Sequence, residues 1–264
     1  MDLGLKGKTT VVTGSTAGIG FAIAAAFAAE SAKVIINGRT QARVTTALEN
    51  IRQRIKVADV RGIPADLGTA QGVAAFLQQA PEADILVNNL GIFEIKPFQE
   101  IPDSDWLRFF EVNVLSGVRL SRHYLPGMLR KNWGRVIFIS SESAQNIPAE
   151  MIHYGMTKTA QVAVARGLAE SVAGTGVTVN SILAGPTASE GVGVFVESMA
   201  KQQGVTKEEI EKQFFSTVRP SSLLKRFETP EEVAAVVVFV ASTQATSING
   251  SAVRAEGGVI RSIF

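Results

Sequence analysis

Short runs of apolar, mostly β-branched residues alternate along the chain with longer segments that are alanine-rich or amphipathic. A short apolar run bounded by turn-forming residues is typical of a buried strand. Such runs predict strands within residues 8–14, 33–38, 58–67, 83–91, 134–141, 176–183 and 251–258. The segments between them predict helices over residues 17–32, 40–57, 70–80, 104–131, 152–173 and 229–241.

This alternation of strands and helices predicts an α/β fold. Strands joined through helices pair in parallel by right-handed crossovers, and continuous apolar strands indicate helices on both faces of the sheet. We therefore expect one doubly wound parallel sheet of about seven strands, with residues 1–264 forming a single domain. The helix over 104–131 should open after Pro102, with Asp103 or Ser104 as its cap.

The rhythm breaks over residues 184–228, which begin with AGPTASEG and include two short predicted helices. An insertion this long after a strand is usually functional, and residues 186–228 are therefore predicted to form a lid over the substrate. Its apolar side chains either cover a hydrophobic substrate or pack on the body of the protein as ordinary helix faces. These side chains are Phe195, Val196, Met199, Phe214 and Phe215.

Composition excludes several classes of function. The chain has no cysteine, which excludes disulfides, thiolate catalysis and zinc–thiolate sites, and its two histidines are too few for a histidine-rich metal site. A net charge of +2 gives no general attraction to nucleic acid or to acidic membranes. The longest apolar runs have nine residues, whereas a membrane span needs about 20. We therefore expect a cytoplasmic protein with neither a nucleic-acid nor a membrane partner.

The first predicted strand is followed by TGSTAGIG, which contains Gly14, Gly18 and Gly20. Glycines let a pyrophosphate approach the backbone closely, and the N-terminus of the following helix offers unpaired N–H groups. A plain tight turn would also use glycine. The position at the first strand–helix junction of an alternating chain favours nucleotide binding and a Rossmann-type sheet.

A second candidate site is HYGMTK, which places Tyr154 and Lys158 four residues apart. Residues at this spacing lie on the same face of a helix. A nearby ammonium favours the phenolate, so Lys158 is expected to lower the pKa of Tyr154 and make it a proton donor or acceptor near neutral pH. The same spacing also occurs by chance on solvated helix faces.

The order of these motifs resembles that of the short-chain dehydrogenases/reductases. The family fingerprint Thr-Gly-x-x-x-Gly-x-Gly corresponds to Thr13–Gly20, and NNLG is similar to the family's Asn-Asn-Ala-Gly, with Leu90 in place of alanine. Ser141 precedes Tyr154 by thirteen residues and Lys158 follows it by four, which are the family's spacings.

The resemblance spans nearly the whole chain, from Lys8 to Gly258. The segment VNSILAGPTAS is similar to the family's Asn-x-x-x-Pro-Gly, but Ala184 stands where proline is usual and Pro186 follows the glycine. Each motif is modest alone. Their joint order and spacing are specific.

The resemblance implies a role for each candidate catalytic residue. Tyr154 would protonate a carbonyl oxygen, or act as base in the reverse direction. Lys158 would lower its pKa and bond the nicotinamide ribose, Ser141 would hold the carbonyl oxygen, and Asn113 would hold a water in a proton relay. Spacing favours Ser141 over its neighbours Ser140 and Ser143.

The resemblance also implies a nicotinamide cofactor bound by residues from several segments. Asp66 and Leu67 resemble the family's adenine contacts, and Thr187 and Ser189 would fix the carboxamide. The full predicted set is Gly14, Ser15, Thr16, Gly18, Ile19, Gly20, Arg39, Asp66, Leu67, Asn89, Gly91, Tyr154, Lys158, Gly185, Thr187 and Ser189.

The end of the second strand favours NADP(H) over NAD(H). An acid at this position would accept a hydrogen bond from the ribose 2′-OH, whereas an arginine accommodates a 2′-phosphate. Here Gly38 stands where the acid is expected and Arg39 follows it. The alternative is a solvated arginine in a turn, and the glycine loop itself carries no second cation.

Three further residues, His153, Glu142 and His123, carry polar side chains without a catalytic assignment. His153 adjoins Tyr154 but points elsewhere on the helix, which indicates a rim or packing residue. Glu142 is expected to be a carboxylate at the rim of the cleft, without an assigned role. His123 is expected to be structural.

The sequence thus predicts an NADP(H)-dependent ketone reductase or alcohol dehydrogenase. A non-catalytic nucleotide sensor or scaffold is the alternative, although it would not need Ser141, Tyr154 and Lys158 together. Epimerisation or dehydration is disfavoured because no separate substrate domain follows. The family pairs its two long helices between subunits, and charged residues make up only 19% of the chain. We therefore expect a homotetramer.

Overall fold

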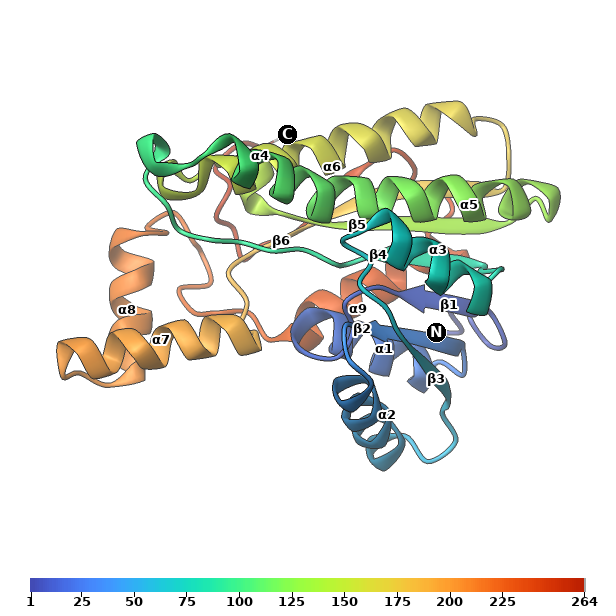
Figure 1. Cartoon of the computed structure of the whole chain (residues 1–264), viewed down its shortest axis with the longest axis horizontal. Coiled ribbons are helices and arrows are strands. Elements are labelled where there is room, and N and C mark those ends of the chain that lie inside the picture. Colours follow the sequence, from blue (N-terminus) through green and yellow to red (C-terminus); the bar gives the residue numbers. More distant parts are fainter. Residues whose placement is uncertain (264) are drawn as a thin grey trace.

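Seven parallel strands form one sheet in the computed structural model, which describes residues 1–263 and, at residues 194 and 195, only the course of the chain. Their order across the sheet is β3-β2-β1-β4-β5-β6-β7 (Figure 1). The predicted doubly wound parallel sheet is confirmed. The strands are β1 (Thr9–Val12), β2 (Lys33–Gly38), β3 (Asp59–Pro64), β4 (Ile85–Asn88), β5 (Gly134–Ser141), β6 (Val177–Ala184) and β7 (Ala252–Ala255).

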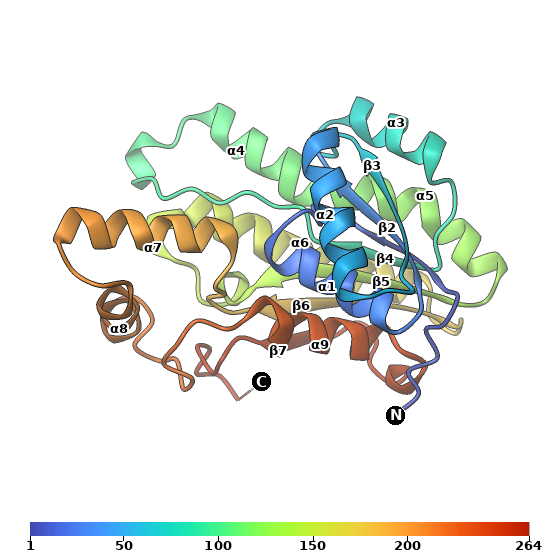
Figure 2. The same cartoon turned by 90° about the horizontal axis from the view of Figure 1, so that it is seen from below.

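Helices cover both faces of the sheet (Figures 1 and 2). One face is covered by α1, α2 and α9, and the other by α3, α5 and α6. The helices are α1 (Gly18–Ala29), α2 (Gln41–Arg54), α3 (Ala70–Gln79), α4 (Asp103–Phe110), α5 (Ser116–Arg130), α6 (Ile152–Ser171), α7 (Glu190–Gln203), α8 (Lys207–Thr217) and α9 (Pro230–Ala241).

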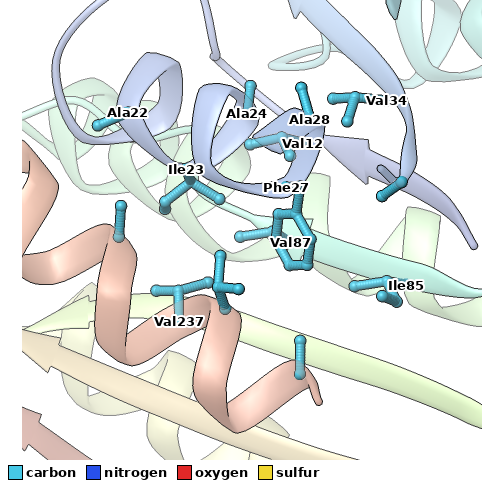
Figure 3. Close-up of a cluster of buried hydrophobic side chains, with 14 of the residues drawn as sticks. Val12, Ala22, Ile23, Ala24, Phe27, Ala28, Val34, Ile85, Val87 and Val237 are labelled. Carbon is cyan, nitrogen blue, oxygen red and sulfur yellow. The ribbon is translucent and has the colours of Figure 1, made fainter. Parts of the chain in front are cut away.

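The core on the α1 side explains why the sequence around α1 is apolar without a polar stripe. Figure 3 shows Ile23 and Phe27 of α1 packed between strand residues such as Val87 on one side and α9, with Val237, on the other. A helix buried between a sheet and another helix has no solvated face, so its apolar residues are not confined to one stripe. Parallel strands covered on both faces are buried throughout, as β5 and β6 are.

The predicted helix over 104–131 is interrupted. It consists of α4, a π-helical turn over Glu111–Leu115 and α5. The predicted cap is also wrong, because Asp103 is already the first helical residue and Pro102 precedes it without a side-chain cap. The π turn contains Asn113, and π turns inside helices often occur at functional sites.

The predicted lid contains the two expected helices, α7 and α8, which extend from one end of the molecule (Figures 1 and 2). Val196, Ala200 and Ile210 form their own small core, and Phe214 and Phe215 pack with Phe227 at 5.1 Å between ring centroids. Most of these side chains therefore hold the two lid helices together. The side chain of Phe195 lies outside the described residues.

The strand order places a crevice where the direction of winding changes. Val12 of β1 pairs with Ile36 of β2 on one side and with Val87 of β4 on the other. The chain leaves β1 and β4 in opposite directions across the sheet, and ligands of such sheets bind outside the carboxyl ends of the strands at this point.

None of the helices within residues 1–263 combines the length and apolar character needed to cross a bilayer.

Candidate active site

The loop after β1 has the backbone conformation that its glycines permit. Gly14 and Gly18 have φ angles of +58° and +55°, which side chains disfavour. A Cβ on Gly20 would lie 2.4 Å from Asn89 Nδ2 and 2.5 Å from the Gly14 carbonyl oxygen. Ser15 is buried, and its hydroxyl donates to the Val12 carbonyl at 2.7 Å. The Ser15 side chain therefore shapes the loop from inside, and its backbone N–H donates to the Asn37 carbonyl at 2.8 Å.

Asn89, at the end of β4, holds this loop in place. Its Nδ2 donates to the carbonyls of Thr13 at 2.9 Å and Gly14 at 3.0 Å. The Thr13 hydroxyl in turn accepts from the backbone N–H groups of Asn89 and Leu90. The structure therefore brings the glycine loop and the NNLG segment together, as a shared cofactor site requires.

The end of β2 lies beside the glycine loop. A Cβ on Gly38 would come within 2.4 Å of the Thr16 Cγ2 atom, and its φ angle is not positive. Arg39 is exposed and has no hydrogen bond or ion pair with any other residue in the range 1–263. Asp66 is exposed and accepts from the Gly68 N–H at 3.0 Å, whereas Leu67 is buried in the core. The side chain of Leu67 is therefore not available to a cofactor.

Ser141, Tyr154 and Lys158 line one cavity of about 290 Å³. Ser141 is the last residue of β5. Its hydroxyl accepts from the Ser143 N–H at 3.1 Å and lies close enough to Tyr154 to lower the pKa of the phenol. Ser140 instead donates to the Lys158 carbonyl at 2.9 Å. Of the three neighbouring serines, Ser141 is the one that faces the tyrosine.

The electrostatics of Tyr154 and Lys158 differ from the expectation. Burial raises the pKa of Tyr154 to about 12, and the Ser141 hydrogen bond only partly offsets this. Burial also lowers the pKa of Lys158 to about 8. The expected lowering of the tyrosine pKa by Lys158 is therefore wrong for the protein by itself. The physical reason is desolvation, which disfavours the charged form of both groups.

Lys158 is held by acceptors that the sequence did not indicate. Its Nζ atom donates to the Ile139 carbonyl at 2.9 Å and to Gln161 Oε1 at 3.2 Å. Gln161 Nε2 donates to the Asn113 carbonyl at 2.6 Å. A buried amide thus links Lys158 to the π turn. The spacing of Gln161, three residues after Lys158, was the only available signal.

The Asn113 side chain is fully engaged. Its Oδ1 accepts from the Ile92 N–H at 2.8 Å, and its Nδ2 donates to the Ile92 carbonyl and to the Thr157 hydroxyl. The side chain therefore fixes the chain after β4 against α6. The Asn113 carbonyl already accepts a hydrogen bond from Gln161 Nε2, so Gln161 competes with the water that Asn113 was predicted to hold.

The loop after β6 forms the far wall of the same cavity, lined there by Gly185, Thr187 and Ser189. The register of β5 and β6 pairs Ser141 with Ala184, which brings this loop beside the tyrosine. Thr187 donates to the Gly185 carbonyl at 2.9 Å, and Ser189 caps the N-terminus of α7.

Two further residues lie close to the tyrosine in the sequence. Glu142 is not at the rim: only 3% of it is exposed, and it pairs with Arg219 of the lid. His153 is fully buried between Trp106 and Phe109, so it packs rather than lining the rim. No group of three or more metal-ligating side chains occurs among residues 1–263.

Comparisons with known proteins agree with this geometry. A family model described as short chain dehydrogenase matches residues 8–200. The chain is 48% identical to the uncharacterized oxidoreductase YvaG of Bacillus subtilis, over 100% of both chains. It is 34% identical to the D-beta-hydroxybutyrate dehydrogenase of Cupriavidus necator, over 96% of this chain and 98% of that protein. The crystal structure of L-sorbose reductase from Gluconobacter frateurii, complexed with NADPH and L-sorbose, matches with a TM-score of 0.94 and 31% identity, over 100% of both chains.

Proposed function

Because the chain belongs to the short-chain dehydrogenases, we propose that it reduces a ketone to a secondary alcohol with NADPH, or catalyses the reverse oxidation. One observation carries this proposal. Ser141, Tyr154 and Lys158 converge in a cavity whose wall also includes Ile19 of the glycine loop and Gly91 after β4. A protein that only sensed nucleotides would not need a buried proton donor at this place.

The residues around the glycine loop fit a dinucleotide. The N-cap residue of α1, Ala17, offers no side-chain cap, so the first N–H groups of the helix remain free for a phosphate. At the other end, a Cβ on Gly91 would stand 3.5 Å from Lys158 Nζ, in the space beside the lysine. Gly91 and Lys158 thus line the same cavity as Ile19 of the glycine loop.

The chemistry at the ketone follows from the protonation states. A pKa of about 12 keeps Tyr154 protonated at neutral pH, which is the form that a reductase needs as proton donor. Ser141 is placed to bond the same carbonyl oxygen. When NADPH is bound, the carbonyl carbon gains its hydride and the oxygen gains the Tyr154 proton, so that the ketone becomes an alcohol and NADPH becomes NADP⁺.

Arg39 supports NADPH as the preferred cofactor. Its guanidinium is exposed at the end of β2 and has no anionic partner within the described part of the chain. A guanidinium makes paired hydrogen bonds to a phosphate group. The L-sorbose reductase that this chain resembles was crystallised with NADPH.

The test is oxidation of NADPH by the purified protein with a panel of ketones, followed by the nicotinamide absorbance. We expect turnover of at least one ketone, with a higher kcat/KM for NADPH than for NADH. Binding of NADPH without turnover of any ketone or alcohol in the panel would favour a nucleotide sensor instead.

We also propose a homotetramer assembled through α5 and α6. Leu120 and Met128 face the sheet, but the outer faces of the two helices form an apolar groove. The groove is lined by Val118, Leu125, Pro126, Leu129, Val164 and Leu168, together with Arg122. A monomeric mass by light scattering at micromolar concentration would refute this assembly.

A further inference from the structure

The substrate end of the cavity combines apolar walls with one buried ion pair. Its apolar walls come from Phe93, Ile95, Met151, Phe214 and Phe227. Glu142 and Arg219 line the same cavity, and their side chains are only 4% and 8% exposed. An ion pair in such a place is costly to desolvate, so it needs further polar partners.

The hydrogen bonds of this pair are incomplete on the carboxylate. Glu142 Oε1 accepts from Arg219 Nε at 2.9 Å and from the Ser143 hydroxyl at 3.2 Å. Glu142 Oε2 is buried and has no hydrogen-bond partner among the residues that the structure describes. Arg219 Nη1 donates to the Val218 carbonyl at 3.0 Å. A buried polar atom without a partner indicates a ligand group that completes it.

We propose that Glu142 and Arg219 bind a hydroxyl group of the substrate, so that the substrate class is a neutral hydroxyketone. This assignment rests on the proposed reduction of a ketone. A hydroxyl can donate to Glu142 Oε2 and accept from the Arg219 guanidinium at the same time. Glu150 also lies 3.9 Å from Arg219 Nη1, so the arginine charge is already balanced and a substrate carboxylate would bring an uncompensated negative charge into the cavity. A hydrocarbon would leave Oε2 without a partner.

The chain connectivity places the hydroxyl close to the reacting carbonyl. Glu142 directly follows Ser141, which faces Tyr154. Glu142 and Arg219 line the same cavity as Tyr154. The hydroxyl therefore belongs on the first or second carbon from the carbonyl, and the product is a diol. The apolar walls contact the rest of the carbon chain.

The first experiment compares matched ligands on the wild-type protein. Acetoin, its β-hydroxy isomer and butanone share a carbon skeleton and differ in the hydroxyl, and acetoacetate adds a carboxylate. Binding to the complex with NADP⁺ is measured by calorimetry, since the oxidised cofactor cannot reduce the ketone, and the nicotinamide absorbance is followed to exclude oxidation of the ligand hydroxyl. At least one hydroxyketone should bind 10-fold or more tighter than butanone and acetoacetate, because a site built for a hydroxyl discriminates strongly against analogues that lack it.

The second experiment uses the double variant Glu142→Leu/Arg219→Met. Replacing a buried ion pair by apolar side chains of similar volume is often tolerated, and the unfolding midpoint and NADP⁺ affinity serve as controls. The preference for the hydroxyketone should fall to about one. Equal affinities for hydroxyketone and butanone in the wild type, a preference for acetoacetate, or an unchanged preference in the double variant would overturn the assignment.

The proposed reduction fails in a different way. Selective binding of a hydroxyketone that NADPH then does not reduce would contradict the reductase while leaving the hydroxyl site in place. Reduction of butanone at the same kcat/KM as the hydroxyketones would support the reductase and overturn the hydroxyl site. The wild-type comparison needs no variant and therefore does not depend on the folding of one.

Discussion

The cleft has a cofactor half around the glycine loop and a substrate half around Glu142 and Arg219. Different kinds of contact hold the two halves together. In the cofactor half, backbone groups and short polar side chains make the contacts, as where Asn89 bonds the carbonyls of Thr13 and Gly14. In the substrate half, side chains from distant segments meet: Glu142 and Arg219 are 77 residues apart in the sequence. The lid that carries Arg219 has its own small core, and it is also tied to the segment after β7, where Ser221 donates to the Val259 carbonyl at 2.6 Å.

This difference implies different sensitivities. The glycine loop is supported by neighbouring strands of the sheet, so changes in the lid beyond Thr187 and Ser189 should leave cofactor binding nearly intact. The substrate half relies on a long-range ion pair that is buried, so the loss of one partner should be felt in the stability of the fold as well as in substrate binding. Variants in each half can test this contrast.

The largest effect is expected for Arg219→Met, which leaves Glu142 buried without its partner. Breaking a buried ion pair costs roughly 3–5 kcal/mol. Burial already raises the pKa of Glu142. A protonated carboxyl tolerates the removal of Arg219 better than a carboxylate does. The loss in the free energy of unfolding should therefore be greater at high pH than at low pH. Urea unfolding of Arg219→Met and of Glu142→Leu/Arg219→Met measures it.

The double variant is the matched control for that measurement. It removes both charges, so most of the lost stability should return, and the affinity for NADPH should stay near the wild-type value in both variants. If the single variant unfolds at the same urea concentration as the double variant, the ion pair does not connect the lid to the sheet in the way described.

A smaller effect is expected for Gln161→Met, which removes an acceptor from Lys158. A hydrogen bond to a charged group is worth about 1.5–3 kcal/mol, so turnover should fall roughly 10-fold or more. Losing an acceptor also disfavours the ammonium form. The pKa of Lys158, already lowered to about 8 by burial, should fall further, and the loss of activity at alkaline pH should begin at lower pH.

Gln161→Glu provides the opposite perturbation at the same atom. A carboxylate favours the ammonium, so the alkaline loss of activity should move to higher pH than in the wild type. A purely structural role of Gln161 predicts lower stability in both variants but no shift of the pH profile in either direction.

A further step down is expected for Arg39→Ala in the cofactor half. Arg39 is exposed, so we take the lower half of the range for a charge-assisted hydrogen bond, about 1.5 kcal/mol. NADPH should then bind roughly 10-fold more weakly, and NADH should be unaffected. The ratio of kcat/KM for the two cofactors measures this. A ratio that does not change would remove Arg39 from the cofactor site.

Introducing a carboxylate at Gly38 should reverse the cofactor preference, but the neighbouring side chain has to make room. A Cβ on Gly38 would meet Thr16 Cγ2 at 2.4 Å, although the backbone conformation there suits other residues. Thr16→Ser removes that methyl group. We therefore expect Gly38→Asp/Thr16→Ser to prefer NADH and to fold better than Gly38→Asp alone.

The cofactor half was largely predictable from the sequence because its requirements are local. The spacing of Gly14, Gly18 and Gly20 reflects positive φ angles and the close approach of Asn89, and both appear as residue types in a short segment. The alternation of strands and helices likewise fixed the sheet, because each element carries its own periodicity.

The substrate half was not predictable because its contacts are long-range. Nothing around Arg219 indicates that it reaches Glu142, and a glutamate beside Ser141 is as compatible with the rim as with the interior. The pKa of Tyr154 was misjudged for the same reason: helix spacing locates Lys158 but gives no account of the burial that raises the pKa. The π turn at Asn113 has no marker in the sequence, because its residues also suit a regular helix.

The most direct test of the account is Tyr154→Phe, which removes one hydroxyl from the centre of the cleft and keeps the ring against Phe93. With NADPH and any ketone that the wild type reduces, turnover should fall about 10²-fold or more, in line with the loss of a general acid. The affinity for NADPH should be nearly unchanged, because the glycine loop is untouched. Reduction at the wild-type rate by this variant would contradict the role of Tyr154 as proton donor.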